Sequence, residues 1–194
     1  MESLKGKVVL LTGATGGIGS KTAALLASSG AQVFLTGRNQ TALHAVAQSA
    51  GIPLQQCLLM DITKENEVTA AVSGVVQQAG TLDILVNAAG IGIIRTMDQL
   101  SSDDFLKSLQ TNLIGPFYLV KAVLPIMKEK KKGLIIQIPG VLGKVPMAGA
   151  AAYCASKYGL TGMMQSIREE LKRTEIRITN IYLGGTDTSF WDNI

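Results

Sequence analysis

The sequence predicts an α/β protein with one doubly wound parallel sheet between two layers of helices, in the strand order 3-2-1-4-5-6. Short aliphatic and β-branched runs alternate with longer segments of helical periodicity, which is typical of successive β-α-β units. A glycine-rich turn joins the first run to the first helical segment, and right-handed crossovers between such units produce a doubly wound sheet. The 194 residues, 47% of them hydrophobic, can bury one core. We therefore expect one domain over residues 1–194.

Six strands are expected where the aliphatic runs lie between turn residues. They are placed near Val8 to Leu11, Gln32 to Thr36, Gln56 to Met60, Ile84 to Asn87, Leu134 to Ile138 and Arg177 to Ile181. Between the first two, Ile18, Thr22, Leu25 and Leu26 recur at helical spacing, which predicts one helix face turned toward the core. Gly30 predicts the end of that helix.

Composition and charge narrow the function classes. The net charge of +4 has no long basic arm behind it, and its densest part, within residues 128–132, follows a helical stretch where cations favour a helix C-terminus. Nucleic-acid binding is therefore not expected. Cys57, Cys154 and His44 show no disulfide or metal-ligand spacing, so no metal site is expected. Because no signal peptide or long apolar segment is recognisable, we expect a cytoplasmic protein without a membrane segment.

The turn after the first expected strand is suited to a phosphate group. It reads Thr12-Gly13-Ala14-Thr15-Gly16-Gly17-Ile18-Gly19. Where side chains are missing, backbone N–H groups at the start of a helix can approach a pyrophosphate closely. The glycines could also serve only a tight strand-to-helix connection, but their place on a β-α junction favours the ligand. The candidate residues are Gly13, Thr15, Gly16, Gly17, Ile18 and Gly19.

The chain resembles the short-chain dehydrogenase/reductase family in three motifs. These are the turn pattern Thr12-Gly13-x-x-x-Gly17-x-Gly19, the run Asn87-Ala88-Ala89-Gly90 and the run Tyr153-Cys154-Ala155-Ser156-Lys157. Gly13, Gly16 and Gly19 also satisfy the pattern of the extended, nucleotide-sugar-modifying branch of that superfamily, whereas the second motif and the short chain favour the simple branch. The resemblance implies a Rossmann fold that binds a nicotinamide dinucleotide.

The segment after the second expected strand favours NADP(H) over NAD(H). Gly37 stands where an acidic residue would accept hydrogen bonds from the adenosine ribose, and Arg38 can form a charge-assisted contact with a 2′-phosphate. An arginine that is merely exposed on a loop is the alternative. The resemblance adds further cofactor-binding residues, which are Asp61, Ile62, Asn87, Ala88, Gly90, Tyr153, Lys157 and Thr188.

The candidate catalytic residues are Tyr153, Lys157 and Asn112. Tyr153 and Lys157 lie four residues apart, on one face of a helix expected to start near Ala151. A phenol with a pKa of about 10 is a poor acid or base at neutral pH, and a neighbouring ammonium favours its ionised form. The resemblance implies that Tyr153 is the general acid/base, that Lys157 lowers its pKa and holds the nicotinamide ribose, and that Asn112 supports a proton-relay water. Asn112 could also be merely a polar helix residue.

Two positions depart from the family pattern. The family usually carries a serine 13 residues before the tyrosine, where its hydroxyl polarises the substrate carbonyl, and this position is Gly140. The second departure is Leu183, which replaces a proline near the C-terminus. Since the sequence stops at Ile194, we expect it either to lack the family's substrate-covering lid and seventh strand or to be truncated.

These observations predict an NADP(H)-dependent oxidoreductase that transfers a hydride between nicotinamide and a small-molecule carbonyl or alcohol. The alternative is an NADP(H)-binding regulatory or scaffold protein in which Gly140 has weakened catalysis. The resemblance also implies a homodimer or homotetramer, paired through the helices at residues 103–130 and 151–173.

Overall fold

The strand order predicted from the sequence is confirmed. A computed structural model describes residues 3–188 and 190. Its sheet has the order β3-β2-β1-β4-β5-β6, and each neighbouring pair is parallel. The strands are β1 (Val8–Thr12), β2 (Gln32–Gly37), β3 (Cys57–Leu59), β4 (Ile84–Asn87), β5 (Lys132–Gln137) and β6 (Glu175–Asn180). The order reverses between β1 and β4, where ligands of such sheets bind beyond the carboxyl ends of the strands.

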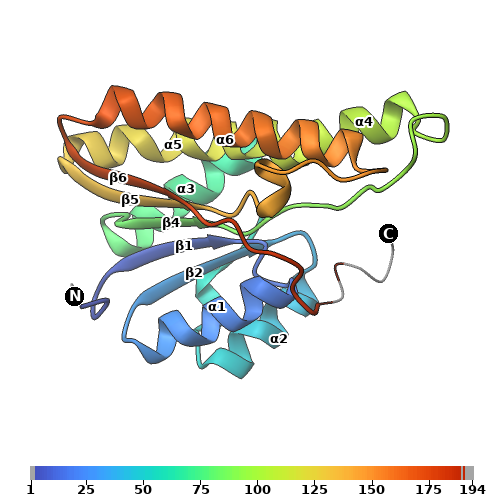
Figure 1. Ribbon diagram of the computed structural model, residues 1–194. Coiled ribbons are helices and arrows are strands. Elements are labelled where there is room, and N and C mark those ends of the chain that lie inside the picture. Colours follow the sequence, from blue (N-terminus) through green and yellow to red (C-terminus); the bar gives the residue numbers. More distant parts are fainter. Residues whose placement is uncertain (1–2, 189, 191–194) are drawn as a thin grey trace.

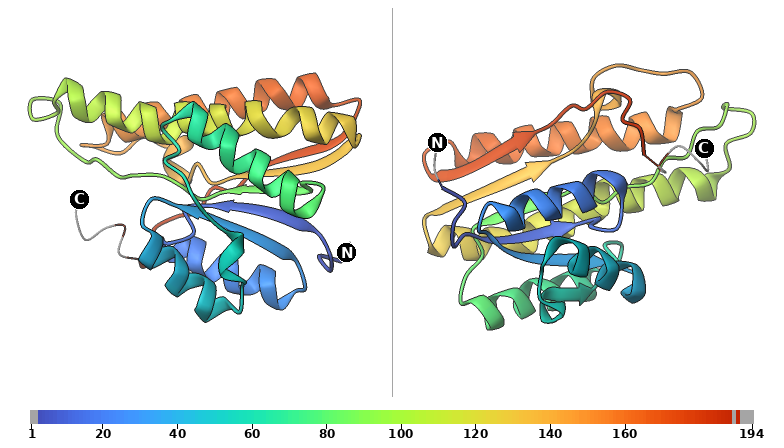
Figure 2. Two further views of the ribbon diagram at one scale, coloured as in Figure 1. Left: turned by 180° about the vertical axis from the view of Figure 1, so that it is seen from behind. Right: turned by 90° about the horizontal axis from the view of Figure 1, so that it is seen from below.

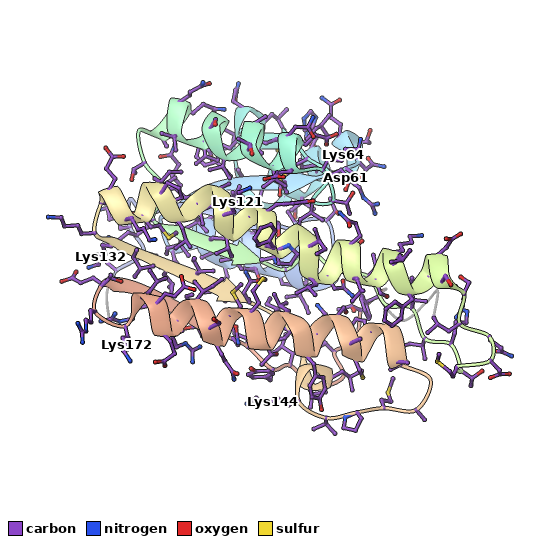
Figure 3. The ribbon with its side chains drawn as sticks, turned by 90° about the horizontal axis from the view of Figure 1, so that it is seen from above. Asp61, Lys64, Lys121, Lys132, Lys144 and Lys172 are labelled. Carbon is purple, nitrogen blue, oxygen red and sulfur yellow. The ribbon has the colours of Figure 1, made fainter. Side chains whose placement is uncertain are left out.

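Helices cover both faces of the sheet (Figure 1). One layer consists of α1 (Gly17–Ser28) and α2 (Gln40–Ala50), and the other of α3 (Glu65–Ala79), α4 (Ser102–Leu109), α5 (Gly115–Glu129) and α6 (Ala151–Leu171). Seen from behind, α3 lies alongside α5 (Figure 2). A π-helical turn (Gln110–Ile114) joins α4 to α5, so that the two form one rod beside α6 (Figure 3).

Both faces of the central strands are buried. In β1, Val8 and Leu10 pack beneath α3, α5 and α6, while Val9 and Leu11 pack against α1 and α2. This division follows from the alternation of side chains along a strand. It also explains why β1 reads as a continuous aliphatic run instead of an alternating one, because parallel sheets are covered on both sides.

The predicted inward face of α1 is partly wrong. Leu25 is 67% exposed, whereas Gly19, Ala23 and Leu26 are buried. A Cβ at Gly19 would run into the backbone of Gly13, so the helix approaches the turn through small residues. The sequence pattern of large apolar side chains did not reveal this face, because the buried side of α1 is made of small residues that allow the helix to pack closely against the turn.

The last two strands begin two residues earlier than predicted. In β5 and β6, Lys132 pairs in register with Glu175, ahead of the aliphatic residues. Charged residues at an exposed strand start join the hydrogen-bond ladder without an apolar pattern. The lysine cluster at residues 128–132 is therefore not all at a helix end: α5 ends at Glu129, Lys132 lies in β5, and Lys130 forms an ion pair with Asp83.

Within the described residues, none of the helices combines the length and the apolar content that a membrane crossing needs. The same part of the chain brings together no group of three His, Cys, Asp or Glu side chains able to hold a metal ion.

Candidate active site

A cavity of about 520 Å³ lies at the carboxyl ends of the strands, as the topology requires. It is lined by almost all of the residues that the sequence predicted to bind the cofactor or to transfer the proton. Those that line it are Gly13, Thr15, Gly16, Gly17, Ile18, Gly19, Arg38, Asp61, Ile62, Ala88, Gly90, Tyr153, Lys157 and Thr188. The side chains of Asn87 and Asn112 are instead buried beside it.

The glycine turn forms a cradle that side chains would fill. Gly13 has φ +66°, and a Cβ there would lie 2.6 Å from the backbone nitrogen of Ala89. A Cβ at Gly17 would lie 2.5 Å from the Thr188 methyl carbon. The helix α1 starts behind this turn with no side chain capping it, so N–H groups of its first turn remain open to a ligand. The cradle therefore fits a dinucleotide pyrophosphate at a positive helix end.

Arg38 and Asp61 flank the cradle, after β2 and β3. Arg38 is exposed at the cavity edge. Burial acts to raise the pKa of Asp61, but hydrogen bonds from the backbone and hydroxyl of Thr63, together with the charges of Arg38 and Lys64, hold that pKa below its usual value. Asp61 and Lys64 lie close together at this end of the molecule (Figure 3). At this end of the cavity, the ionised Asp61 carboxylate is held by hydrogen bonds within the protein, and the Arg38 guanidinium is exposed to solvent.

Tyr153 and Lys157 face the cavity from the first turns of α6. No described residue hydrogen-bonds the Tyr153 hydroxyl, and burial raises the pKa of this phenol to about 12. The Lys157 ammonium is 5.4 Å from the centre of the Tyr153 ring and donates to the carbonyl of Ile138 at 3.4 Å. Burial lowers the pKa of Lys157 to about 8. In this arrangement burial outweighs the expected effect of the ammonium on the phenol, which is protonated at neutral pH and can donate.

Comparison with known proteins agrees with this geometry. The model of the short chain dehydrogenase family matches residues 7–194. The chain belongs to the short-chain dehydrogenase family. An uncharacterized oxidoreductase of Staphylococcus saprophyticus is 33% identical over 100% of this chain and 80% of that protein. Among solved structures, a variant of actinorhodin polyketide ketoreductase with NADPH is similar with a TM-score of 0.89 and 33% identity, covering 97% of this chain and 74% of that one. A metagenomic short-chain oxidoreductase in complex with NADP has a TM-score of 0.87 and 35% identity, covering 93% and 83%.

In this short-chain dehydrogenase, the side chain of Asn112 forms hydrogen bonds with other residues of the protein. Its oxygen accepts from the backbone nitrogen of Ile91 at 2.9 Å, and its amide donates to the Ile91 carbonyl at 2.9 Å and to the Ser156 hydroxyl at 3.1 Å. Ser156 in turn donates to the carbonyl of Tyr153 at 2.7 Å. Both amide hydrogens of Asn112 are therefore committed to positioning the cavity wall, and its predicted contact with a relay water stays a prediction.

Ser156 is the residue that the sequence reasoning missed. It is fully buried and links the rod of α4 and α5 to the carbonyl of Tyr153. Its place directly before Lys157, on the helix that carries Tyr153, was the available signal, because a polar residue on the buried side of a helix needs a partner.

Asn87 lies in a buried polar row beneath the cavity. Thr12, Asn87, Gln137 and Asn180 stand in register across β1, β4, β5 and β6. The Thr12 hydroxyl donates to the Asn87 oxygen, and the Asn87 amide donates to the Gln137 oxygen at 2.8 Å. The row thus ties three strand ends together, and the cofactor contact predicted for Asn87 stays a prediction.

Gly140 adopts a backbone conformation that a serine rarely takes. Its φ is +71° and its ψ is 171°. A Cβ would have room, since its nearest neighbour would be the Leu183 carbonyl oxygen at 3.6 Å. The obstacle is therefore backbone strain, of about 1–3 kcal/mol for such a position, and not a steric clash.

Proposed function

We propose that this chain catalyses the NADP(H)-dependent interconversion of a carbonyl compound and its alcohol. The observation that carries the proposal is that one cavity is lined both by the glycine cradle and by Tyr153, whose hydroxyl has no hydrogen-bond partner among the described residues. The nicotinamide, when bound, supplies or accepts the hydride at the carbonyl carbon. The two structural relatives described above contain NADPH and NADP, which supports this cofactor class.

Different residues of this chain bind the cofactor, donate the proton and stabilise the phenolate. The glycine cradle and Arg38 bind the two phosphate-bearing parts of the cofactor. In the direction of reduction, the Tyr153 hydroxyl gives its proton to the carbonyl oxygen as the new C–H bond forms at the carbon, so the products are an alcohol and NADP⁺. The ammonium of Lys157 then faces the phenolate that remains and stabilises it.

The test is NADPH oxidation, followed by absorbance, across a broad panel of ketones and aldehydes, with NADPH binding measured separately by fluorescence. Turnover of at least one carbonyl compound is expected. Binding of NADPH without any turnover would instead favour a cofactor-binding regulatory or scaffold protein, a function that the missing hydroxyl at Gly140 favours.

We expect NADPH to bind about 10-fold to 100-fold more tightly than NADH, because a hydrogen bond between charged groups contributes about 1.5–3 kcal/mol. Arg38→Ala is expected to remove most of this preference. The matched control is Arg168→Ala, which removes an exposed arginine of α6 outside the cavity. Dissociation constants measured by fluorescence at equal ionic strength check the prediction, and equal affinities in the unmutated protein contradict it.

Introducing a serine at Gly140 is not expected to increase the rate. A hydrogen-bond donor at the substrate carbonyl can contribute about 10²–10³ in rate, but the side chain must take up the left-handed backbone of Gly140. Gly140→Ser and Gly140→Ala should both lose about 1–3 kcal/mol of unfolding free energy. Their rates should differ by less than about 10-fold. Chemical denaturation and kcat/KM check this pair, and a serine variant about 100-fold faster than the alanine variant would show that the backbone adapts.

A further inference from the structure

The π-helical turn between α4 and α5 forms part of the cavity wall. It comprises Gln110–Ile114, and Thr111 within it lines the cavity. The next residue, Asn112, holds the wall beside Tyr153 through the hydrogen bonds described above. Because a π-helical turn inserts an extra residue into a helix, it redirects the side chains around it, and such turns are frequent at functional sites. The contacts of Gln110, the first residue of the turn, therefore bear on the shape of the cavity.

The side chain of Gln110 reaches the segment that follows β3. Its amide donates to the Thr63 carbonyl at 3.1 Å, and the bond is part-buried. Thr63 lines the cavity and also holds the Asp61 carboxylate, through its backbone N–H at 2.9 Å and its hydroxyl at 2.7 Å. The polar groups of Thr63 thus connect Asp61 to the rod that α4 and α5 form.

Close packing accompanies this hydrogen bond. A Cβ at Gly115, the first residue of α5, would lie 2.7 Å from the Ile62 side chain and 2.9 Å from the Ile62 carbonyl oxygen. The rod and the segment after β3 are therefore in direct contact. Packing of this kind limits how closely the two approach, whereas a hydrogen bond has a preferred direction and fixes how the segment is aligned on the rod.

The segment 61–63 lies on the adenosine side of the cavity. Gly37 pairs with Leu59 at the ends of β2 and β3, so Arg38 and the segment after β3 leave the sheet next to each other. Seen from above, Asp61 lies on the side of the rod opposite to α6, the helix that carries the proton donor (Figure 3). In the proposed function Arg38 binds the 2′-phosphate of the cofactor, so the segment 61–63 flanks the adenosine half.

We propose that Gln110 is a positioning residue for the adenosine half of NADP(H), acting through the Thr63 carbonyl. This inference rests on the cofactor of the proposed function. Gln110 itself does not line the cavity, whereas Asp61, Ile62 and Thr63 do. Without the hydrogen bond the segment would sample displaced positions, and a ligand would bind only the aligned fraction of the molecules.

The inference is tested with NADPH and with its two halves, 2′,5′-ADP and reduced nicotinamide mononucleotide. Gln110→Met keeps the side-chain length and removes the donor. It should weaken NADPH and 2′,5′-ADP by about 3-fold to 5-fold, a loss limited by the contribution of one neutral hydrogen bond. The affinity for the mononucleotide should not change. Calorimetric and fluorescence titrations supply the dissociation constants.

Two further variants serve as rescue and control. Gln110→Lys keeps a donor of similar reach and should restore the affinity for 2′,5′-ADP, measured at an ionic strength of about 0.5 M so that the added charge is screened. Gln77→Met makes the same chemical change at an exposed position of α3 and should leave all three dissociation constants unchanged.

A brace that only stabilises the fold would give a different result. Gln110→Met would then lower the free energy of unfolding, measured with urea, without changing the affinity for 2′,5′-ADP, and this outcome overturns the inference. An equal loss for both halves of the cofactor, a lysine variant as weak as the methionine variant, or no binding of 2′,5′-ADP to the unmutated protein also overturns it. These titrations need no carbonyl substrate, so absence of NADPH oxidation would contradict the proposed reductase function without deciding the role of Gln110.

Discussion

Replacing Tyr153 by phenylalanine is expected to lower kcat/KM by about 10²–10⁴ while leaving the dissociation constant for NADPH nearly unchanged. A positioned general acid contributes rate factors of this size. The substitution removes only the hydroxyl, for which the described residues provide no hydrogen-bond partner. The ring keeps its packing against Phe190, so the shape of the cavity is preserved.

The matched control for this variant is Tyr158→Phe. Tyr158 lies on the same helix but is 43% exposed and does not line the cavity. Steady-state rates and fluorescence titrations of both variants are the measurements. If Tyr153→Phe kept the full rate, another group would have to supply the proton and the assignment of Tyr153 would be wrong.

Lys157→Met is expected to stabilise the fold and to disable the site. Burial holds the pKa of Lys157 at about 8, below its ordinary value of 10.5. Because one pKa unit corresponds to about 1.4 kcal/mol, the buried ammonium costs on the order of 3 kcal/mol near pH 7. A methionine of similar length removes that cost. The same change removes the cation that stabilises the Tyr153 phenolate, so turnover should fall by at least about 10²-fold.

The stabilisation has a defined dependence on pH. Below pH 8 both the folded and the unfolded chain carry a protonated Lys157, and the full cost of burial is present. Between pH 8 and 10.5 the folded protein releases this proton before the unfolded chain does, so the unmutated protein gains stability and the advantage of Lys157→Met shrinks. Urea unfolding of both proteins across this range is the measurement, with Lys128→Met at an exposed position as control. An advantage that does not change with pH would contradict a buried charge as its cause.

The sheet order could be predicted because the same pattern, an aliphatic run followed by a helix, recurs along the sequence. Since the connections between parallel strands are right-handed, few strand orders are compatible with that pattern. The cradle residues and the pair Tyr153 and Lys157 line one cavity, and the local spacing of their motifs was enough to single them out, while their roles stay predictions. The inward face of α1 was not, since it depends on how closely Gly19 approaches Gly13 in space.

Tertiary contacts decide the remaining differences. The resemblance implies a relay water at Asn112, and that role stays a prediction; what the sequence does not indicate is that the Asn112 side chain bonds to Ile91 and Ser156. The pKa of Tyr153 depends on burial, which no spacing encodes. The left-handed backbone of Gly140 arises where the chain turns out of β5, with Val141 donating to the Leu183 carbonyl at 2.7 Å.

The side-chain bonds among Thr12, Asn87 and Gln137 also determine where the cavity can move. They lie at the line where the chain leaves β1, β4 and β5, and they are shielded from water. Displacing any of these strand ends breaks a buried hydrogen bond in addition to the backbone ladder, which raises the free energy of local opening at this line. The segment from Val141 to Met147 is largely exposed, and among the described residues it is held to the chain after β6 by the Val141–Leu183 backbone hydrogen bond and by Lys144 over the Tyr182 ring, with no buried side-chain hydrogen bond of this kind. We therefore expect the motions that admit a ligand to involve the rim more than the floor that aligns cofactor and proton donor.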